Sequence, residues 1–222
     1  MAITRRKFLQ AAGALALMGG LLAAAGGDFS RLAIGPAAAE TVPVEDLMAA
    51  GPLEDRVVGA AEAPVTVVEY ASMTCPHCAD FHTKVYPELK KRYIETGKAR
   101  FIFREFPLER RAALGSVLAR CAGADNYFAV IDALFRAQDK WAVRNPMKPL
   151  FALAKKVGFT EKTFDACIAN QDLLTRIEQS RDRAAEKLGV DATPTFFING
   201  TKLVGAESIE EMAAAIDPLL KN

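Results

Sequence analysis

Two cysteines three positions apart, directly after an apolar strand pattern, are the feature that most restricts the fold of this chain. Cys75 and Cys78 enclose Pro76 and His77, and residues 64–70 before them are mostly β-branched and apolar. This pattern predicts a buried strand followed by a helix that begins near Cys75. Pro76 fits the first helical turn, where its missing N–H is not needed. We therefore expect two thiols at the start of a helix that follows a buried strand.

A helix N-terminus changes the chemistry of a cysteine that lies there. Its unpaired N–H groups and the positive end of the helix dipole favour a thiolate over a thiol. The thiolate attacks disulfides and departs from them, so a lowered pKa sets the direction of thiol–disulfide exchange. We expect Cys75 to be the nucleophile, Cys78 one turn deeper to be the resolving thiol, and a Cys75–Cys78 disulfide to be the oxidised form. His77 is expected to add positive potential at the Cys75 sulfur.

The N-terminal segment has the three parts of an export signal. Residues 5–7 (Arg-Arg-Lys) precede an Ala/Gly/Leu-rich run over residues 8–27, and residues 37–39 (Ala-Ala-Ala) offer a small-residue cleavage site. The paired arginines before Phe-Leu resemble a twin-arginine signal, with a Sec signal or a retained membrane anchor as the alternatives. We expect cleavage after Ala39 and a mature protein in the periplasm.

Export places the cysteines where disulfides persist. All four cysteines lie beyond Ala39, and removal of residues 1–39 leaves 24 basic and 26 acidic residues, a net charge of −2. No clustered basic face is visible, which argues against a nucleic-acid partner. In this compartment a C-x-x-C motif points to making disulfides rather than to removing them.

The rest of the chain divides into a lead-in, two strand regions and a helical block. Residues 40–62 predict a polar lead-in with a short helix near 44–50. Residues 99–106 alternate apolar and charged side chains, which predicts a half-buried strand that Pro107 ends. From 109 to 188 the pattern is helical throughout.

A hairpin and a last helix follow the helical block. Residues 195–198 and 202–204 predict two strands joined by Asn199-Gly200, a dipeptide typical of tight hairpin turns. Residues 208–211 (Ser-Ile-Glu-Glu) form a capping box and predict the start of the last helix.

This order of elements resembles an α/β thioredoxin fold with an inserted α-helical domain, and three motifs resemble the DsbA family of exported thiol oxidases. The motifs are Val67-Val68-Glu69-Tyr70, Cys75-Pro76-His77-Cys78 and Thr193-Pro194-Thr195-Phe196, and the likeness covers about residues 55–220. It implies a thioredoxin-like domain of residues 63–108 and 189–222, with residues 109–188 as the insertion.

The resemblance also implies what the protein acts on. We expect a monomeric oxidase that uses no cofactor and no metal, oxidises cysteine-containing exported proteins and is reoxidised by a membrane-bound partner.

The same resemblance implies roles for three further residues. Pro194 is expected to form a cis peptide bond with Thr193 and to face the active-site sulfurs. Thr193 presents backbone groups that can pair with a substrate strand, and a threonine rather than a valine here is a departure within the family. Glu69 is expected to be a buried carboxylate that takes or relays the proton of Cys78; the alternative is a glutamate that reaches solvent or pairs with a base.

Two more cysteines lie in the helical block. Cys121 and Cys167 have no neighbour at motif spacing, and in an oxidising compartment we expect them to pair with each other. Two buried free thiols and a regulatory redox pair are the alternatives.

Other functions use parts of the same pattern. An isomerase or reductase of this fold is usually a dimer with a separate dimerisation domain, for which residues 40–62 leave little room. A zinc module could use Cys75, Cys78 and His82, but it lacks an evident fourth ligand, and we expect His82 to be an exposed helix residue. A cytoplasmic glutathione-dependent isomerase shares the plan but disagrees with the export signal and with the intact C-x-x-C.

Overall fold

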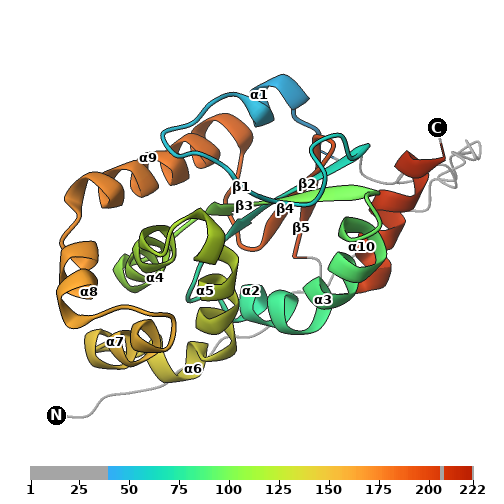
Figure 1. The fold of residues 1–222 in the computed structure, drawn as a ribbon. Coiled ribbons are helices and arrows are strands. Elements are labelled where there is room, and N and C mark those ends of the chain that lie inside the picture. The colour runs from blue at the N-terminus through green and yellow to red at the C-terminus, as the bar shows by residue number, and fades with distance from the viewer. Residues whose placement is uncertain (1–39, 206–207, 222) are drawn as a thin grey trace, which may run out of the picture. The chain divides into compact units, whose positions relative to one another are not determined.

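A five-stranded mixed sheet forms the centre of the computed structural model, which describes residues 40–205 and 208–221 (Figure 1). The expected export signal lies outside the described residues. The strand order is β1-β3-β2-β4-β5; β2 runs parallel to β3, and the other neighbours are antiparallel. The strands are β1 (Arg56–Val58), β2 (Val65–Ala71), β3 (Ala99–Glu105), β4 (Thr195–Ile198) and β5 (Thr201–Val204).

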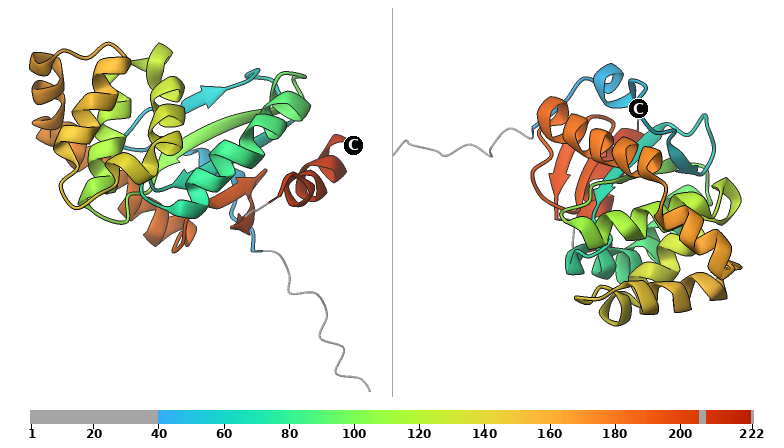
Figure 2. Two further views of the ribbon diagram at one scale, coloured as in Figure 1. Left: turned by 90° about the horizontal axis from the view of Figure 1, so that it is seen from below. Right: turned by 90° about the vertical axis from the view of Figure 1, so that its left-hand side faces the viewer.

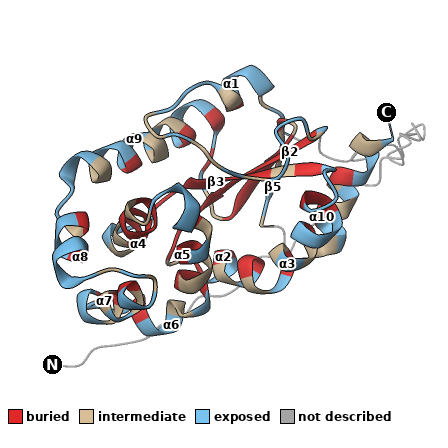
Figure 3. Cartoon of the chain, viewed as in Figure 1, coloured by how far each residue is buried: buried red, intermediate tan, exposed pale blue. Residues whose placement is uncertain are grey.

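Every residue of β2 is buried, because helices cover both faces of the sheet (Figure 3). On one face Val68 and Tyr70 pack against α1 (Val44–Met48) and α9 (Gln171–Leu188). On the other face Val65, Val67 and Ala71 join a larger core with the helix after β2 and with the helical block. The strand that leads to the cysteine motif therefore lies at the centre of the core.

The helix after β2 runs from Pro76 to Ile94 in four stretches. It contains α2 (Pro76–Asp80), a π-helical stretch (Phe81–Val85), α3 (Tyr86–Leu89) and a second π-helical stretch (Lys90–Ile94). Pro87 lacks the N–H that an α-helical ladder needs and its ring crowds the preceding turn, so the helix widens just before it.

The helical block gathers to one side of the sheet (Figure 2). The Thr160 hydroxyl caps α8 (Glu161–Ile168) and the Asn170 side chain caps α9, which Gly189 ends in a left-handed conformation. Its members besides α9 are α4 (Arg110–Cys121), α5 (Ala124–Arg136), α6 (Gln138–Trp141), α7 (Met147–Lys156) and α8 (Glu161–Ile168).

The hairpin and the last helix form as predicted. Asn199 and Gly200 both have positive φ between β4 and β5, and a Cβ on Gly200 would lie 2.5 Å from the carbonyl oxygen of Val42, so only glycine fits there. Ser208 and Glu211 cap each other at the start of α10 (Ile209–Ile216), which leads into a 3₁₀ turn (Asp217–Leu220).

Two predictions in the sheet were wrong or incomplete. The lead-in contains β1, which pairs with β3 and which the sequence pattern did not indicate. The strand over residues 99–106 is not half-buried, because Arg104 and Glu105 are themselves buried. Arg104 donates two hydrogen bonds to the Asp55 carboxylate, and Glu105 accepts two from the Arg120 guanidinium, so both charges are paired inside the protein.

Candidate active site

The two motif cysteines begin α2 at the end of the buried strand β2. Cys75 is the N-cap residue, with extended φ and ψ, and Pro76 occupies the first helical position. Both thiols are reduced; Cys75 is 7% exposed and Cys78 is fully buried. His77 lies exposed on the first turn of the helix. The predicted position of the pair at a helix start is therefore the observed one.

The hydrogen-bond donors around Cys75 favour its thiolate. The pKa of the Cys75 thiol is lowered to about 5, chiefly because the Cys78 thiol donates a hydrogen bond to its sulfur. Burial acts in the opposite direction, while Thr193 and the backbone N–H groups of Cys78 and His77 lower the pKa further. The surroundings of Cys75 therefore favour its thiolate at neutral pH.

Cys78 has the opposite tendency. Burial raises the pKa of the Cys78 thiol well above its ordinary value, and the hydrogen bond to Cys75 and the negative charge of Glu69 act in the same direction. Two thiols three positions apart thus differ strongly in acidity, so one is suited to attack and to departure and the other to holding a proton.

A loop that is distant in sequence, at Thr193 and Pro194, completes the site beside Cys75. The Thr193–Pro194 peptide bond is cis, and the Cys75 thiol donates a hydrogen bond of 3.2 Å to the carbonyl oxygen of Thr193. The Thr193 hydroxyl oxygen is buried and has no hydrogen-bond partner among the described residues. A carbonyl acceptor and a hydroxyl donor therefore both lie beside the reactive sulfur.

Gln138 supports the loop that carries Cys75. Its side-chain amide in α6 donates 3.0 Å hydrogen bonds to the carbonyl oxygens of Met73 and Cys75. Sequence reasoning missed Gln138, because it lies 63 residues from Cys75 and belongs to no local motif.

Glu69 of β2 and His82 of the helix after β2 form a buried pair. The Glu69 side chain is fully buried, and its Oε2 atom lies 2.7 Å from His82 Nε2. Burial raises the pKa of the Glu69 carboxyl, although His82 opposes this shift. Glu69 thus combines the two expected alternatives, since it is buried and also pairs with a base.

The prediction of an exposed His82 was wrong. Its side chain is 3% exposed and stacks on Phe135, with 4.4 Å between the ring centroids. His82 stands one helical turn after Cys78 and shares its inward face, where Glu69 needs a hydrogen-bond donor. In residues 40–205 and 208–221 no three His, Cys, Asp or Glu side chains come together as a metal site, so Cys75, Cys78 and His82 do not form a zinc constellation there.

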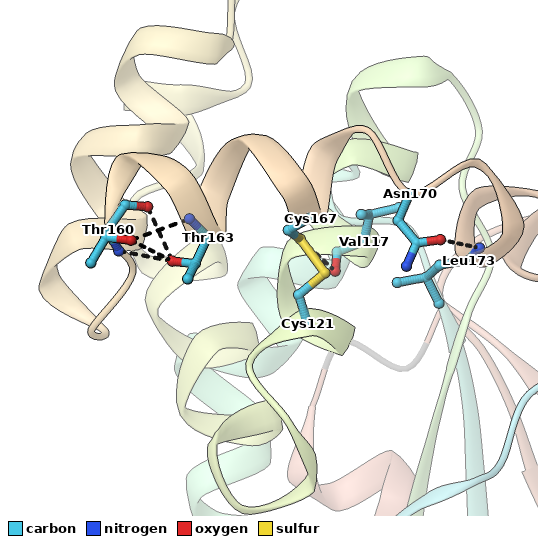
Figure 4. The surroundings of a disulfide bond; sticks show 7 residues. All are labelled: Val117, Cys121, Thr160, Thr163, Cys167, Asn170 and Leu173. Carbon is cyan, nitrogen blue, oxygen red and sulfur yellow. Dashed lines mark hydrogen bonds between the residues drawn. A yellow bond between two sulfur atoms is a disulfide. The ribbon is translucent and has the colours of Figure 1, made fainter.

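The other two cysteines join two helices of the insertion. A disulfide links Cys121, at the end of α4, with Cys167 on α8, and their Cα atoms lie 6.0 Å apart (Figure 4). It spans 46 residues of sequence separation.

Comparisons with known proteins agree that the chain has a thioredoxin-like fold. Residues 53–218 match the family model described as Thioredoxin. The chain is 33% identical to alpha-DsbA1 of Wolbachia pipientis, with a TM-score of 0.74 over 81% of this chain and 96% of that structure. BdbD of Bacillus subtilis, at 22% identity, is similar in fold alone, with a TM-score of 0.70 over 83% of this chain and 98% of that structure.

Curated Rickettsia relatives are longer than the matched region. A Rickettsia bellii protein, named as a protein-disulfide oxidoreductase, is 34% identical over 169 residues, which are 75% of this chain and 65% of that protein. The chain covers 61% of the Rickettsia conorii relative and 60% of the Rickettsia felis relative.

Proposed function

The chain belongs to the DsbA family of thioredoxin-fold proteins, and on this premise we propose that it is a thiol:disulfide oxidoreductase that introduces disulfides into exported proteins. Its fold is the α/β thioredoxin fold with an inserted α-helical domain that the sequence predicted. The observation that carries the proposal is the geometry at the start of α2: Cys75 is the N-cap residue beside the cis Thr193–Pro194 bond, and Cys78 is fully buried one turn deeper.

The proposed reaction begins with a Cys75–Cys78 disulfide. A substrate thiolate attacks the Cys75 sulfur, so a substrate–Cys75 mixed disulfide forms and Cys78 leaves. The second substrate thiolate then attacks the substrate sulfur of the mixed disulfide and releases Cys75 as a thiolate. The substrate loses two electrons and the protein gains them. A lowered pKa makes Cys75 a good leaving group, which favours oxidation of the substrate.

Proton transfer accompanies the departure of Cys78. Its raised pKa means that the buried sulfur takes up a proton once it leaves the disulfide. Glu69 is the proposed donor, because its buried carboxyl has a raised pKa and its charge acts on the Cys78 thiol. His77, exposed on the first turn, is proposed to add positive potential near the Cys75 thiolate.

Thr193 and Pro194 are the proposed substrate-binding residues. The Thr193 carbonyl that now accepts the Cys75 thiol would instead accept a backbone N–H from an extended substrate segment. The unpartnered Thr193 hydroxyl is placed to donate a hydrogen bond to the Cys75 thiolate.

The cellular setting follows from the same proposal. We place the mature protein in the periplasm as a monomer of one thioredoxin-like domain (63–108 and 189–222) and one insertion (109–188), reoxidised by a membrane-bound partner after each cycle. Among the residues that the structure describes, no helix is both long and apolar enough to cross a bilayer.

Trapping with Cys78→Ala tests this function. Without the resolving thiol, Cys75 is expected to remain in mixed disulfides with exported proteins that contain pairs of cysteines. The double variant Cys75→Ala/Cys78→Ala is the matched control and should trap none. If the single variant collects no exported protein under oxidising growth, the proposed function is wrong.

A further inference from the structure

A cavity of about 350 Å³ lies on the outer side of His82, beneath α5. Its wall is mostly apolar, but four titratable or charged side chains besides His82 face it. Tyr86 and Lys90 come from the helix after β2, and Asp132 and Arg136 come from α5, where they form an ion pair of 2.8 Å. The cavity thus offers water a polar entrance beside an otherwise apolar surface.

His82 connects this cavity with the buried carboxylate. Its ring lines the cavity and also bonds the Glu69 carboxylate through Nε2. Aromatic rings surround it on the remaining sides: Phe135 stacks on it, and Phe81, Phe101 and Phe103 pack against it. Tyr86, which also lines the cavity, packs against the imidazole as well, with 5.2 Å between the ring centroids. Because the phenylalanine rings carry no titratable group, Glu69, Tyr86 and the cavity are the polar surroundings that these contacts leave to the imidazole.

Glu69 in turn interacts with Cys78. Cys78 and His82 stand four residues apart on the inward face of one helix, and Glu69 bonds the second of them from β2. The other carboxylate oxygen, Oε1, is buried without a hydrogen-bond partner among the described residues. The charge of Glu69 also raises the pKa of the Cys78 thiol, which means that the two groups interact electrostatically.

We propose that His82 is the outer member of a proton path that connects Cys78, through Glu69, with water in the cavity beside α5. This inference rests on the proposed dithiol–disulfide exchange and adds the route by which its proton reaches solvent.

Each transfer along the path is balanced. When Cys78 leaves the disulfide as a thiolate, the Glu69 carboxyl gives it a proton and becomes a carboxylate. The His82 Nε2–H then gives its proton to Glu69, and the other ring nitrogen takes a proton from water. When Cys78 attacks a mixed disulfide, every proton moves in the opposite direction.

A second buried glutamate shows what a structural pair looks like in the same sheet. Glu105 accepts hydrogen bonds from the Arg120 guanidinium and from the Tyr127 hydroxyl, so both of its oxygens are occupied by a partner that is always charged. Glu69 instead has one oxygen without a hydrogen-bond partner among the described residues, and its partner is an imidazole, which can both give and take a proton. That difference favours proton transfer over charge neutralisation at Glu69.

His82→Gln tests the path, because a glutamine amide can donate the same hydrogen bond to Glu69 but cannot pass on a proton. The measurement is the rate at which the oxidised full-length protein is reduced by a dithiol peptide between pH 5 and pH 9. We expect a loss of about tenfold near neutral pH, smaller than removal of a direct general acid causes. The equilibrium potential against glutathione should stay unchanged, because a relay alters rates and not end states.

A double-variant comparison separates a relay from a packing effect. If His82 acts through Glu69, His82→Gln should slow the Glu69→Gln protein no further. An undiminished loss in that background would overturn the path, and so would a wild-type rate for His82→Gln at every pH.

Ala129→Phe offers a route that leaves the buried pair intact, should His82→Gln fail to fold. Ala129 is exposed and lines the cavity, so a larger side chain narrows it and should slow the reaction several-fold. Ala124→Phe, on an exposed part of α5 outside the cavity wall, is the matched control. An unchanged rate in Ala129→Phe would contradict the cavity as the exit of the proton.

If the wild-type protein itself does not exchange disulfides with the peptide, the proposed function fails and not the proton path alone.

Discussion

Cys75 of the motif pair and Cys167 of the disulfide in the insertion are about equally buried, yet the surroundings of the two pairs differ completely. Cys75 is 7% exposed and Cys167 is 5% exposed, so burial does not distinguish a reactive sulfur from a structural one. Cys75 lies at a helix start among hydrogen-bond donors and a cis-proline loop, whereas Cys121 and Cys167 join two helices of the insertion. The donors around the sulfur, rather than its accessibility, separate the two roles.

The largest contrast is expected when each pair is removed in turn. Cys75→Ala should abolish oxidation of a dithiol peptide, because Cys78 then has no cysteine with which to form the disulfide that the substrate thiolate attacks. Below about pH 5, where the Cys75 thiolate adds no stability, the thermal unfolding of this variant should stay close to that of the reduced wild type. Oxidation at a measurable rate by Cys75→Ala would show that the nucleophile lies elsewhere.

The reverse result is expected for the second pair. Cys121→Ala/Cys167→Ala should lower the free energy of unfolding by up to about 4 kcal/mol, because the disulfide closes a loop of nearly fifty residues. Its activity per folded molecule should equal that of the wild type. Urea unfolding together with the peptide assay measures both quantities, and a loss of activity without a loss of stability would contradict a structural role.

A pH series sharpens the comparison within the reduced protein. The pKa of Cys75 in the folded protein, about 5, lies below the ordinary thiol value of 9.0. The stability that its thiolate adds to the folded state is therefore complete above about pH 9. The contribution is lost as the pH falls through about 5. Above pH 9 the raised pKa of Cys78 acts against stability.

Urea unfolding under reducing conditions checks this sign. The free energy of unfolding of the wild type should rise relative to that of Cys75→Ser between pH 5 and pH 8. Parallel curves for the two proteins would mean that Cys75 gains nothing from its surroundings.

The smallest effect is expected at Thr193. Thr193→Val removes the hydroxyl that can donate to the Cys75 thiolate but keeps the carbonyl and the shape of the side chain. The pKa of Cys75 should rise by less than about one unit, because Cys78 is the larger contributor. Alkylation of Cys75 as a function of pH measures this shift, and a fall in the pKa would contradict the proposed hydrogen bond.

Local patterns predicted the parts of the site that depend on neighbours in sequence. The apolar strand before Cys75, the position of Pro76 and the Asn199-Gly200 turn all follow from short-range preferences. The capping box at Ser208 is of the same kind.

The errors arose where burial depends on distant partners. His82 was expected to be exposed because nothing adjacent in sequence shows that Glu69, thirteen residues earlier, lies beneath it. Arg104 is buried because Asp55, 49 residues away, pairs with it. Gln138 reaches the Cys75 loop from a helix of the insertion. A single sequence does not reveal such contacts.

The most direct test of the account is the thiolate pKa of Cys75 itself. The ultraviolet absorbance of the thiolate, recorded for the reduced protein as a function of pH, gives this value. The same titration of Cys75→Ser is the blank. The account predicts a midpoint at about 5, with Cys78 remaining protonated throughout the neutral range. A midpoint near the ordinary thiol value of 9.0 would contradict it.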